Sequence, residues 1–264
     1  MELGLRGKVA LVTASSKGIG LGVGKVLAQE GCKVIISSRT SDSVERARET
    51  IVNETGNSDV FGIVADLTSK SDVQHLIRTG SEKAGNIDIL AYNTGPPKPG
   101  TFSELDDDEW DYGVKLLLSS AVRLAKGVVQ EMVKKRWGRL IFITSTTLRQ
   151  PMNNLLLSNT VRLSLAGLSK SLATEYGPKG VTSNGIMQGH ILTDRQKQIA
   201  ADVSKRKGVS VDDAMKQALA EVPLGRYGTP EEVGYLVAFL ASDRAGYING
   251  AMISIDGGMI RSTF

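Results

Sequence analysis

Three polar residues near the middle of the chain, Ser145, Ser158 and Arg162, have types and a spacing suited to holding a small polar ligand. Ser158 and Arg162 are four residues apart in a stretch with a helical pattern, so we expect their side chains on one helix face. A serine hydroxyl can orient a substrate oxygen but is a poor acid, and an arginine stays protonated at any relevant pH. This group therefore predicts hydrogen bonding and positive charge, with little acid–base strength.

A second group of residues has the composition of a phosphate-binding turn. The sequence T-A-S-S-K-G-I-G runs from Thr13 to Gly20, between an apolar run and an amphipathic stretch. Small residues let the backbone approach a pyrophosphate closely, and the start of a helix offers free N–H groups and a partial positive charge. Ser16 and Lys17 add further donors. The residues expected to bind the phosphates are Thr13, Ser16, Lys17, Gly18, Ile19 and Gly20.

Short apolar runs alternate with longer amphipathic stretches along the whole chain. The expected strands are Val9–Thr13, Val34–Ser38, Val60–Ala65, Ile87–Tyr92, Arg139–Thr144, Val181–Ile186 and Met252–Ile255. The expected helices are Ile19–Glu30, Ser41–Glu54, Ser71–Ala84, Asp107–Lys135, Asn153–Glu175 and Pro230–Leu240. Such alternation predicts an α/β fold, a Rossmann-type doubly wound parallel sheet of about seven strands with helices on both faces. We expect residues 1–264 to form a single domain of this kind.

One charged helical stretch, around residues 194–222, interrupts this alternation. It lies between the sixth expected strand and the helix that begins at Pro230. Two interpretations stay open: a mobile loop that covers the substrate, and a helical hairpin on the surface.

Composition excludes several classes of protein. Cys32 is the only cysteine, which rules out an internal disulfide and any multi-cysteine zinc site, and no metal is expected. A reducing compartment, the cytoplasm, fits best. The net charge of +4 comes without the aromatic and basic pattern typical of nucleic-acid binding. The first residues have no apolar signal core, and no stretch is long enough to cross a membrane.

From about Gly7 to Gly258 the chain resembles the short-chain dehydrogenase/reductase family, and in particular its 3-oxoacyl carrier-protein reductases. The matching segments, in family order, are Thr13–Gly20, Asp66-Leu67, Asn93-Thr94-Gly95, Ser145, Gln188–Thr193 and Ile255–Gly258. Two positions depart from the family pattern within these segments: Ala14 stands where the first glycine is usual, and Gln188 where proline is usual.

The resemblance implies cofactor contacts beyond the phosphate turn. The residues that it assigns to the cofactor are Asp66, Leu67, Asn93, Thr94, Gly95, Ile191, Thr193 and Arg162. Cofactor choice follows from charge, because relatives that prefer NAD(H) carry an acid at the end of the second strand. Here Ser38 stands at that place and Arg39 follows it, and a guanidinium suits a 2′-phosphate. We therefore expect NADP(H) to be favoured over NAD(H).

The resemblance also shows what is unusual at the catalytic centre. Ser145 matches the family's serine, but Ser158 stands where a tyrosine donates the proton and Arg162 where a lysine tunes that tyrosine. Leu117 falls near the place of a fourth family residue, an asparagine. His190, Tyr92 and Tyr112 are alternative proton donors, and each of them also has a purely structural interpretation.

Two functions follow from these observations. The first is an NADP-dependent oxidoreductase that transfers a hydride between nicotinamide and a small carbonyl or alcohol substrate, with Ser145, Ser158 and Arg162 as its atypical catalytic residues. The alternative is a non-catalytic nucleotide sensor on the same scaffold. The resemblance implies a homo-oligomer, a dimer or a tetramer, through the two longest helices.

Overall fold

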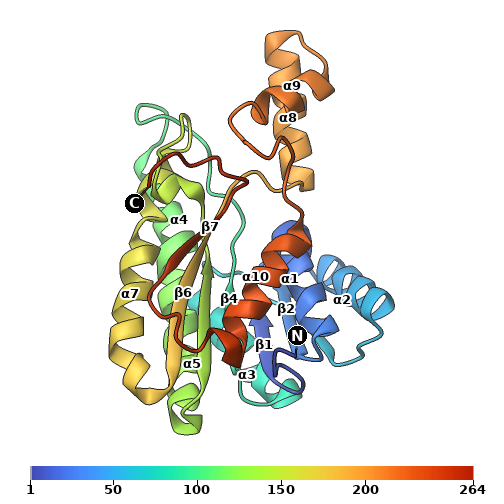
Figure 1. Cartoon of the computed structure of the whole chain (residues 1–264), viewed down its shortest axis with the longest axis vertical. Helices are drawn as coiled ribbons and strands as arrows, with labels where there is room; N and C mark the ends of the chain where they lie inside the picture. Colours follow the sequence, from blue (N-terminus) through green and yellow to red (C-terminus); the bar gives the residue numbers. More distant parts are fainter. Residues whose placement is uncertain (1, 264) are drawn as a thin grey trace.

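The computed structural model describes residues 2–263, and its centre is one parallel sheet of seven strands in the order β3-β2-β1-β4-β5-β6-β7 (Figure 1). The strands are β1 (Val9–Val12), β2 (Lys33–Ser38), β3 (Val60–Val64), β4 (Ile89–Tyr92), β5 (Gly138–Ile143), β6 (Val181–Gln188) and β7 (Met252–Ile255). The strand order reverses between β1 and β4, and in sheets of this kind ligands bind beyond the carboxyl ends of the strands at that reversal.

Helices cover both faces of the sheet, because its central strands are apolar on both sides. One face is covered by α1 (Gly18–Gln29), α2 (Ser41–Thr55) and α10 (Pro230–Ala241). The other is covered by α3 (Lys70–Ala84), α5 (Ser120–Lys135) and α7 (Ser164–Tyr176). The predicted doubly wound α/β fold is therefore confirmed.

The first of the two longest expected helices is not continuous. The stretch predicted over Asp107–Lys135 is divided into α4 (Asp107–Val114), a π-helical turn η1 (Lys115–Ser119) and α5. A π-turn releases backbone carbonyls from the regular helical pattern. Here the hydroxyl of Tyr92 donates to the carbonyls of Leu116 and Leu117, at 3.0 and 2.8 Å.

The stretch predicted over Asn153–Glu175 is also divided, into α6 (Leu156–Val161) and α7. Asn154 has a left-handed backbone, with φ of 62°, so the helix begins only after it. Between the two helices Leu165 N–H donates to the carbonyl of Arg162, three residues back, which tightens the chain locally. Both divisions lie beside residues of the expected catalytic centre.

The inserted stretch between β6 and α10 forms two helices, α8 (Asp194–Lys207) and α9 (Val211–Ala218). They lie side by side and project from the sheet as a hairpin (Figure 1). No helix within residues 2–263 has the length and apolar character needed to cross a membrane.

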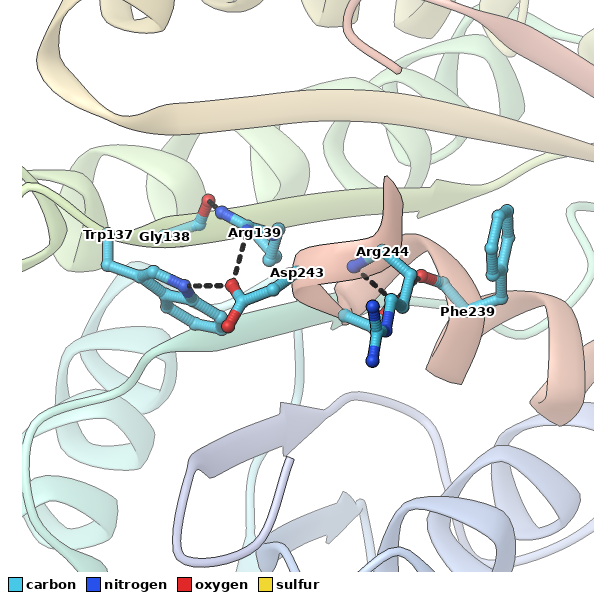
Figure 2. A network of polar contacts seen from close by, with 7 residues as sticks. Trp137, Gly138, Arg139, Phe239, Asp243 and Arg244 are labelled. Carbon is cyan, nitrogen blue, oxygen red and sulfur yellow. Dashed lines mark hydrogen bonds and ion pairs between the residues drawn. The ribbon is translucent and has the colours of Figure 1, made fainter. Parts of the chain in front are cut away.

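A polar network ties the amino end of β5 to the segment after α10 (Figure 2). Arg139 is only 5% exposed, and it donates to the carboxylate of Asp243 at 3.2 Å. The Trp137 indole N–H donates to the same oxygen at 2.8 Å, and the Arg139 guanidinium lies 4.2 Å from the centroid of the Trp137 ring. Buried positive charge at this end of the sheet therefore has an acidic partner.

Candidate functional site

The turn after β1 is hydrogen-bonded to the turn after β4, as a binding site at the strand reversal requires. The Thr13 hydroxyl donates to the carbonyl of Asn93 at 2.7 Å and accepts from its N–H at 2.9 Å. The Asn93 side-chain amide donates to the carbonyl of Ala14 at 3.1 Å. These bonds place Thr13 and Asn93 at the carboxyl ends of neighbouring strands and hold the two turns together.

The geometry of the first turn fits a bound pyrophosphate. Helix α1 begins at Gly18, and no side chain caps its first N–H groups. Gly20 approaches the backbone so closely that a Cβ there would lie 2.4 Å from the carbonyl oxygen of Ala14. Gly18 has φ of +55° and Ala14 has φ of 46°, a left-handed conformation that favours glycine. The open helix start offers backbone donors to an anion.

Thr193 and Ile191 lie close to this turn, although they are far from it in sequence. A Cβ built on Gly18 would lie 3.2 Å from the Thr193 side chain. The Thr193 hydroxyl accepts from the N–H of Gln196 at 3.3 Å and so caps the start of α8. Ile191 is buried in the core under α1 and α10. The inserted helices therefore start beside the phosphate turn.

The residues expected around the adenosine part of a cofactor lie at the ends of β2 and β3. The Ser16 hydroxyl donates to that of Ser38 at 3.0 Å, which joins the phosphate turn to the end of β2. Arg39 and Lys17 are both exposed on this side. One carboxylate oxygen of Asp66 accepts from the backbone N–H and the hydroxyl of Thr68, each at 2.8 Å. Leu67 beside it is buried.

Ser145, Ser158 and Arg162 are brought together at the carboxyl ends of β4 and β5. The Ser145 hydroxyl accepts from the N–H of Thr147 at 3.2 Å. The hydroxyls of Thr147 and Ser158 lie 3.2 Å apart. Arg162 donates to the Thr94 hydroxyl at 3.4 Å. We call Thr94, Ser145, Thr147, Ser158 and Arg162 the hydroxyl–arginine cluster.

Thr147 is the member of this cluster that sequence reasoning missed. Its signal is its place two residues after Ser145, at the end of the same strand. Its contact with Ser158 depends on the way in which α6 folds back over this strand end, and no local pattern contains that information. Gly95, in the turn after β4, is exposed.

Arg162 is 8% exposed, and its guanidinium makes one long hydrogen bond, to a neutral hydroxyl. Burial lowers the pKa of Arg162, with a smaller opposing effect from Tyr92. Within residues 2–263, no acidic side chain forms an ion pair or hydrogen bond with it. Apolar residues surround this part of the chain, in a cluster around Leu117, Leu157 and Val161.

The two tyrosines considered as proton donors lie in different surroundings. Tyr92 is fully buried, and burial raises the pKa of its phenol far above the usual range. Its proton is donated to the carbonyls of Leu116 and Leu117 in η1. Tyr112 is exposed on α4. The structure thus gives each tyrosine a place outside the hydroxyl–arginine cluster.

His190 lies beyond β6, in a surface recess that it shares with Arg226, Glu232 and Asp256. Its ring packs edge-on against Tyr227, with centroids 6.1 Å apart, and its Nδ1 lies 3.4 Å from the Gln196 amide nitrogen. Burial lowers the pKa of His190, while Glu221 acts weakly in the opposite direction. None of the residues that line this recess belongs to the hydroxyl–arginine cluster.

Comparisons with known proteins identify the family of this chain. A family model described as enoyl-(acyl carrier protein) reductase matches residues 13–260. The 3-oxoacyl-[acyl-carrier-protein] reductase FabG of Escherichia coli K12 is 34% identical over 257 residues, which cover 97% of this chain and 99% of the relative.

Two solved structures are informative. L-sorbose reductase of Gluconobacter frateurii, in complex with NADPH and L-sorbose, has a TM-score of 0.95 and 31% identity, and the match covers 99% of this chain and 100% of that one. A short-chain oxidoreductase of Pseudomonas aeruginosa PAO1, described as containing an atypical catalytic centre, has a TM-score of 0.89 and 25% identity, over 97% and 98% of the two chains. The chain therefore belongs to the short-chain dehydrogenase/reductase family of oxidoreductases.

Proposed function

We propose that this protein is an NADP(H)-dependent oxidoreductase that acts on a small carbonyl or alcohol substrate. The observation that carries the proposal is the uncapped start of α1, set in a turn that is hydrogen-bonded to the turn after β4. The hydroxyl–arginine cluster lies at the carboxyl end of that same strand and of its neighbour β5. A nicotinamide held there would supply a hydride, and the cofactor would carry the redox chemistry.

Different residues of the chain would bind different parts of the cofactor. The first turn of α1 would hold the phosphates through its backbone N–H donors. Thr13 and Ser16 would fix the turn before it, through their hydrogen bonds to Asn93 and Ser38. Asn93 would support the nicotinamide end, because its side chain already fixes the turn around Ala14. The strain at Ala14 and the close approach at Gly20 support this assignment, since both shape the turn that faces the phosphates.

The preference for NADP(H) rests on charge at the end of β2. Arg39 and Lys17 are exposed on either side of the Ser16–Ser38 hydrogen bond, where a 2′-phosphate would be expected. A fixed guanidinium suits a phosphate, while a neutral serine leaves the ribose hydroxyls without the acid that NAD(H) enzymes use. The NADPH found with the L-sorbose reductase is in line with this choice.

At the substrate, the cluster can orient and polarise an oxygen but cannot supply a strong acid. The Ser145 hydroxyl accepts from Thr147 N–H, so its own proton is free to point toward a substrate oxygen. The Ser158 hydroxyl is hydrogen-bonded to that of Thr147, and it can help Ser145 to orient the substrate oxygen. Arg162 can stabilise negative charge on that oxygen, but it keeps its proton. The proton would therefore come from water.

The rival function is a nucleotide sensor that has lost the reaction. The observation that favours it is the commitment of Tyr92 to backbone carbonyls, which leaves the site with no group of suitable pKa. Both functions require the cofactor, so cofactor binding alone does not separate them.

Two measurements test the proposal. The affinities for NADPH and NADH should differ by about 10- to 100-fold, since a charged hydrogen bond contributes roughly 1.5–3 kcal/mol, and Arg39→Ala should reduce that ratio. NADPH oxidation should then be followed at high protein concentration over a carbonyl panel, with Ser145→Ala as the inactive control. Normal NADPH binding without turnover of any carbonyl would favour the sensor.

We also propose that α8 and α9 cover the bound substrate and that the chain acts in the cytoplasm as a homodimer or homotetramer. The first proposal is supported by the position of Thr193 against Gly18. The homo-oligomer is supported by exposed apolar side chains, among them Leu163, just before α7, and Tyr112 on α4. Light scattering that gives only monomer at micromolar concentration would contradict it.

A further inference from the structure

The hydroxyl–arginine cluster combines hydrogen-bond donors with a positive charge. Each of its five side chains can donate a hydrogen bond, and none carries a negative charge. Arg162 alone has five N–H donors, of which the structure uses one, at 3.4 Å. A ligand that satisfies this set must offer several acceptors close together.

Within residues 2–263 Arg162 has no acidic partner, whereas a second arginine that is mostly buried, Arg139, has one. Arg139 and Arg162 are 5% and 8% exposed. Arg139 has the carboxylate of Asp243 at 3.2 Å, whereas Arg162 has only the hydroxyl of Thr94. A buried charge without a counterion costs several kcal/mol. An anion from outside the chain would supply the acidic partner that Arg162 lacks within residues 2–263.

The contacts of Arg162 indicate where such an anion would bind. Its guanidinium reaches Thr94 in the turn after β4, while Ser158, one helical turn earlier, reaches Thr147 in the segment after β5. An anion at Arg162 would lie near these two neighbouring strand ends, and Ser145 follows β5 at one of them. A planar guanidinium binds a carboxylate through two parallel hydrogen bonds.

The geometry points to a substrate carboxylate as the partner of Arg162. This inference rests on the proposed function and narrows its substrate class: the protein takes short oxo acids, or the corresponding hydroxy acids, whose carboxylate lies next to the reacting carbonyl or one carbon away. Arg162 pairs with the carboxylate, and Ser145 holds the carbonyl oxygen. The cluster selects these acids because a neutral ligand leaves the buried guanidinium unpaired.

The test uses unreactive probes, so that binding is measured without turnover. Oxamate and malonamate carry a carboxylate next to an amide carbonyl or one carbon away, and oxamide and malonamide are their uncharged counterparts. Calorimetry with the full-length protein, with and without saturating NADP⁺, should show one of the acids binding about 10- to 100-fold more tightly than its diamide. NADPH affinity is measured separately for every variant.

Three variants test which side chain causes the preference for the acid over its diamide. Arg162→Met should remove the preference for the acid, because it removes the positive charge proposed to pair with the carboxylate. The NADPH affinity of this variant, measured separately, shows whether the guanidinium also contacts the cofactor. Arg162→Lys should keep part of the preference, because an ammonium keeps the charge but not the paired donors. Arg149→Met is the matched control: it removes an exposed arginine four residues after Ser145 and should change neither affinity.

The outcomes are distinct. If Arg162→Met weakens NADPH and leaves the acid preference unchanged, the guanidinium serves the cofactor ribose and the inference is wrong. Equal binding of acids and diamides by the unmodified protein would also overturn it. Acid binding that depends on Arg162, in a protein that binds no NADP(H), would support the anion site and reject the proposed oxidoreductase.

Discussion

The Tyr92 hydroxyl lies 2.8 Å from the carbonyl oxygen of Leu117, and this bond joins the end of β4 to the π-helical turn η1. The same hydroxyl donates to Leu116 and lies 2.7 Å from the hydroxyl of Ser120. A buried phenol thus satisfies the carbonyls that the π-turn releases from the helix.

Tyr92→Phe should lower the free energy of unfolding by about 1–3 kcal/mol, because it removes the buried hydrogen bonds of the phenol to the carbonyls of η1. Urea denaturation followed by circular dichroism measures this change. Tyr247→Phe removes the hydroxyl of a fully exposed tyrosine and should have no effect. An unchanged midpoint for Tyr92→Phe would mean that another donor replaces the phenol.

Arg162→Met should raise the stability of the free protein by about 1–3 kcal/mol, since it removes a buried charge that has no counterion and retains the apolar bulk. Thermal unfolding without ligands measures the change. The same substitution at Arg139 should destabilise the protein, because Asp243 and Trp137 then lose their partner. A lower melting temperature for Arg162→Met would contradict the description of Arg162 as unpaired.

Ser158→Tyr combined with Arg162→Lys should create or raise carbonyl reduction by roughly 10²–10⁴-fold, the usual contribution of general acid catalysis. Either change alone should do less, because the lysine tunes the tyrosine and the pair acts as a unit. Leu117 can limit the gain, since it provides no polar group for a proton relay. The comparison requires normal folding and NADPH affinity. A double mutant that meets both conditions and reduces no carbonyl would favour the sensor.

His190 should make the protein less stable as the pH falls. Burial lowers its pKa in the folded chain below the usual value near 6.5. The unfolded chain therefore takes up a proton first, and stability falls as the pH drops below about 6.5, until the folded form also protonates. Urea midpoints from about pH 8 to pH 5 should be flatter for His190→Gln than for the unmodified protein. His75→Gln, at an exposed position, is the control.

The sheet was predictable because its strands are apolar almost throughout, a pattern that belongs to parallel strands covered on both faces. The runs at Val34–Ser38 and Val181–Ile186 illustrate this, and both lie within observed strands. The phosphate turn was predictable because glycine and small residues there have a local backbone reason. Gly20 approaches Ala14 too closely for any side chain.

The interior of the site was less predictable, because its contacts join residues distant in sequence. Nothing near Tyr92 indicates that its hydroxyl serves carbonyls more than twenty residues later. The break between α6 and α7 and the pairing of Thr147 with Ser158 likewise depend on how the two long segments pack. Periodicity marks both stretches as helical but carries no signal for a π-turn or for a left-handed Asn154.

The two ends of the sheet differ in how their buried arginine is bonded to the rest of the chain. At the amino end, Arg139 is linked to Asp243 and Trp137, so each of these residues constrains the other two. At the carboxyl end, Arg162 is linked to the rest of the chain by one hydrogen bond to a hydroxyl. Arg162 itself can therefore be exchanged without breaking an ion pair within residues 2–263. For enzyme engineering, new chemistry is best introduced around Arg162, with the amino end left as it is.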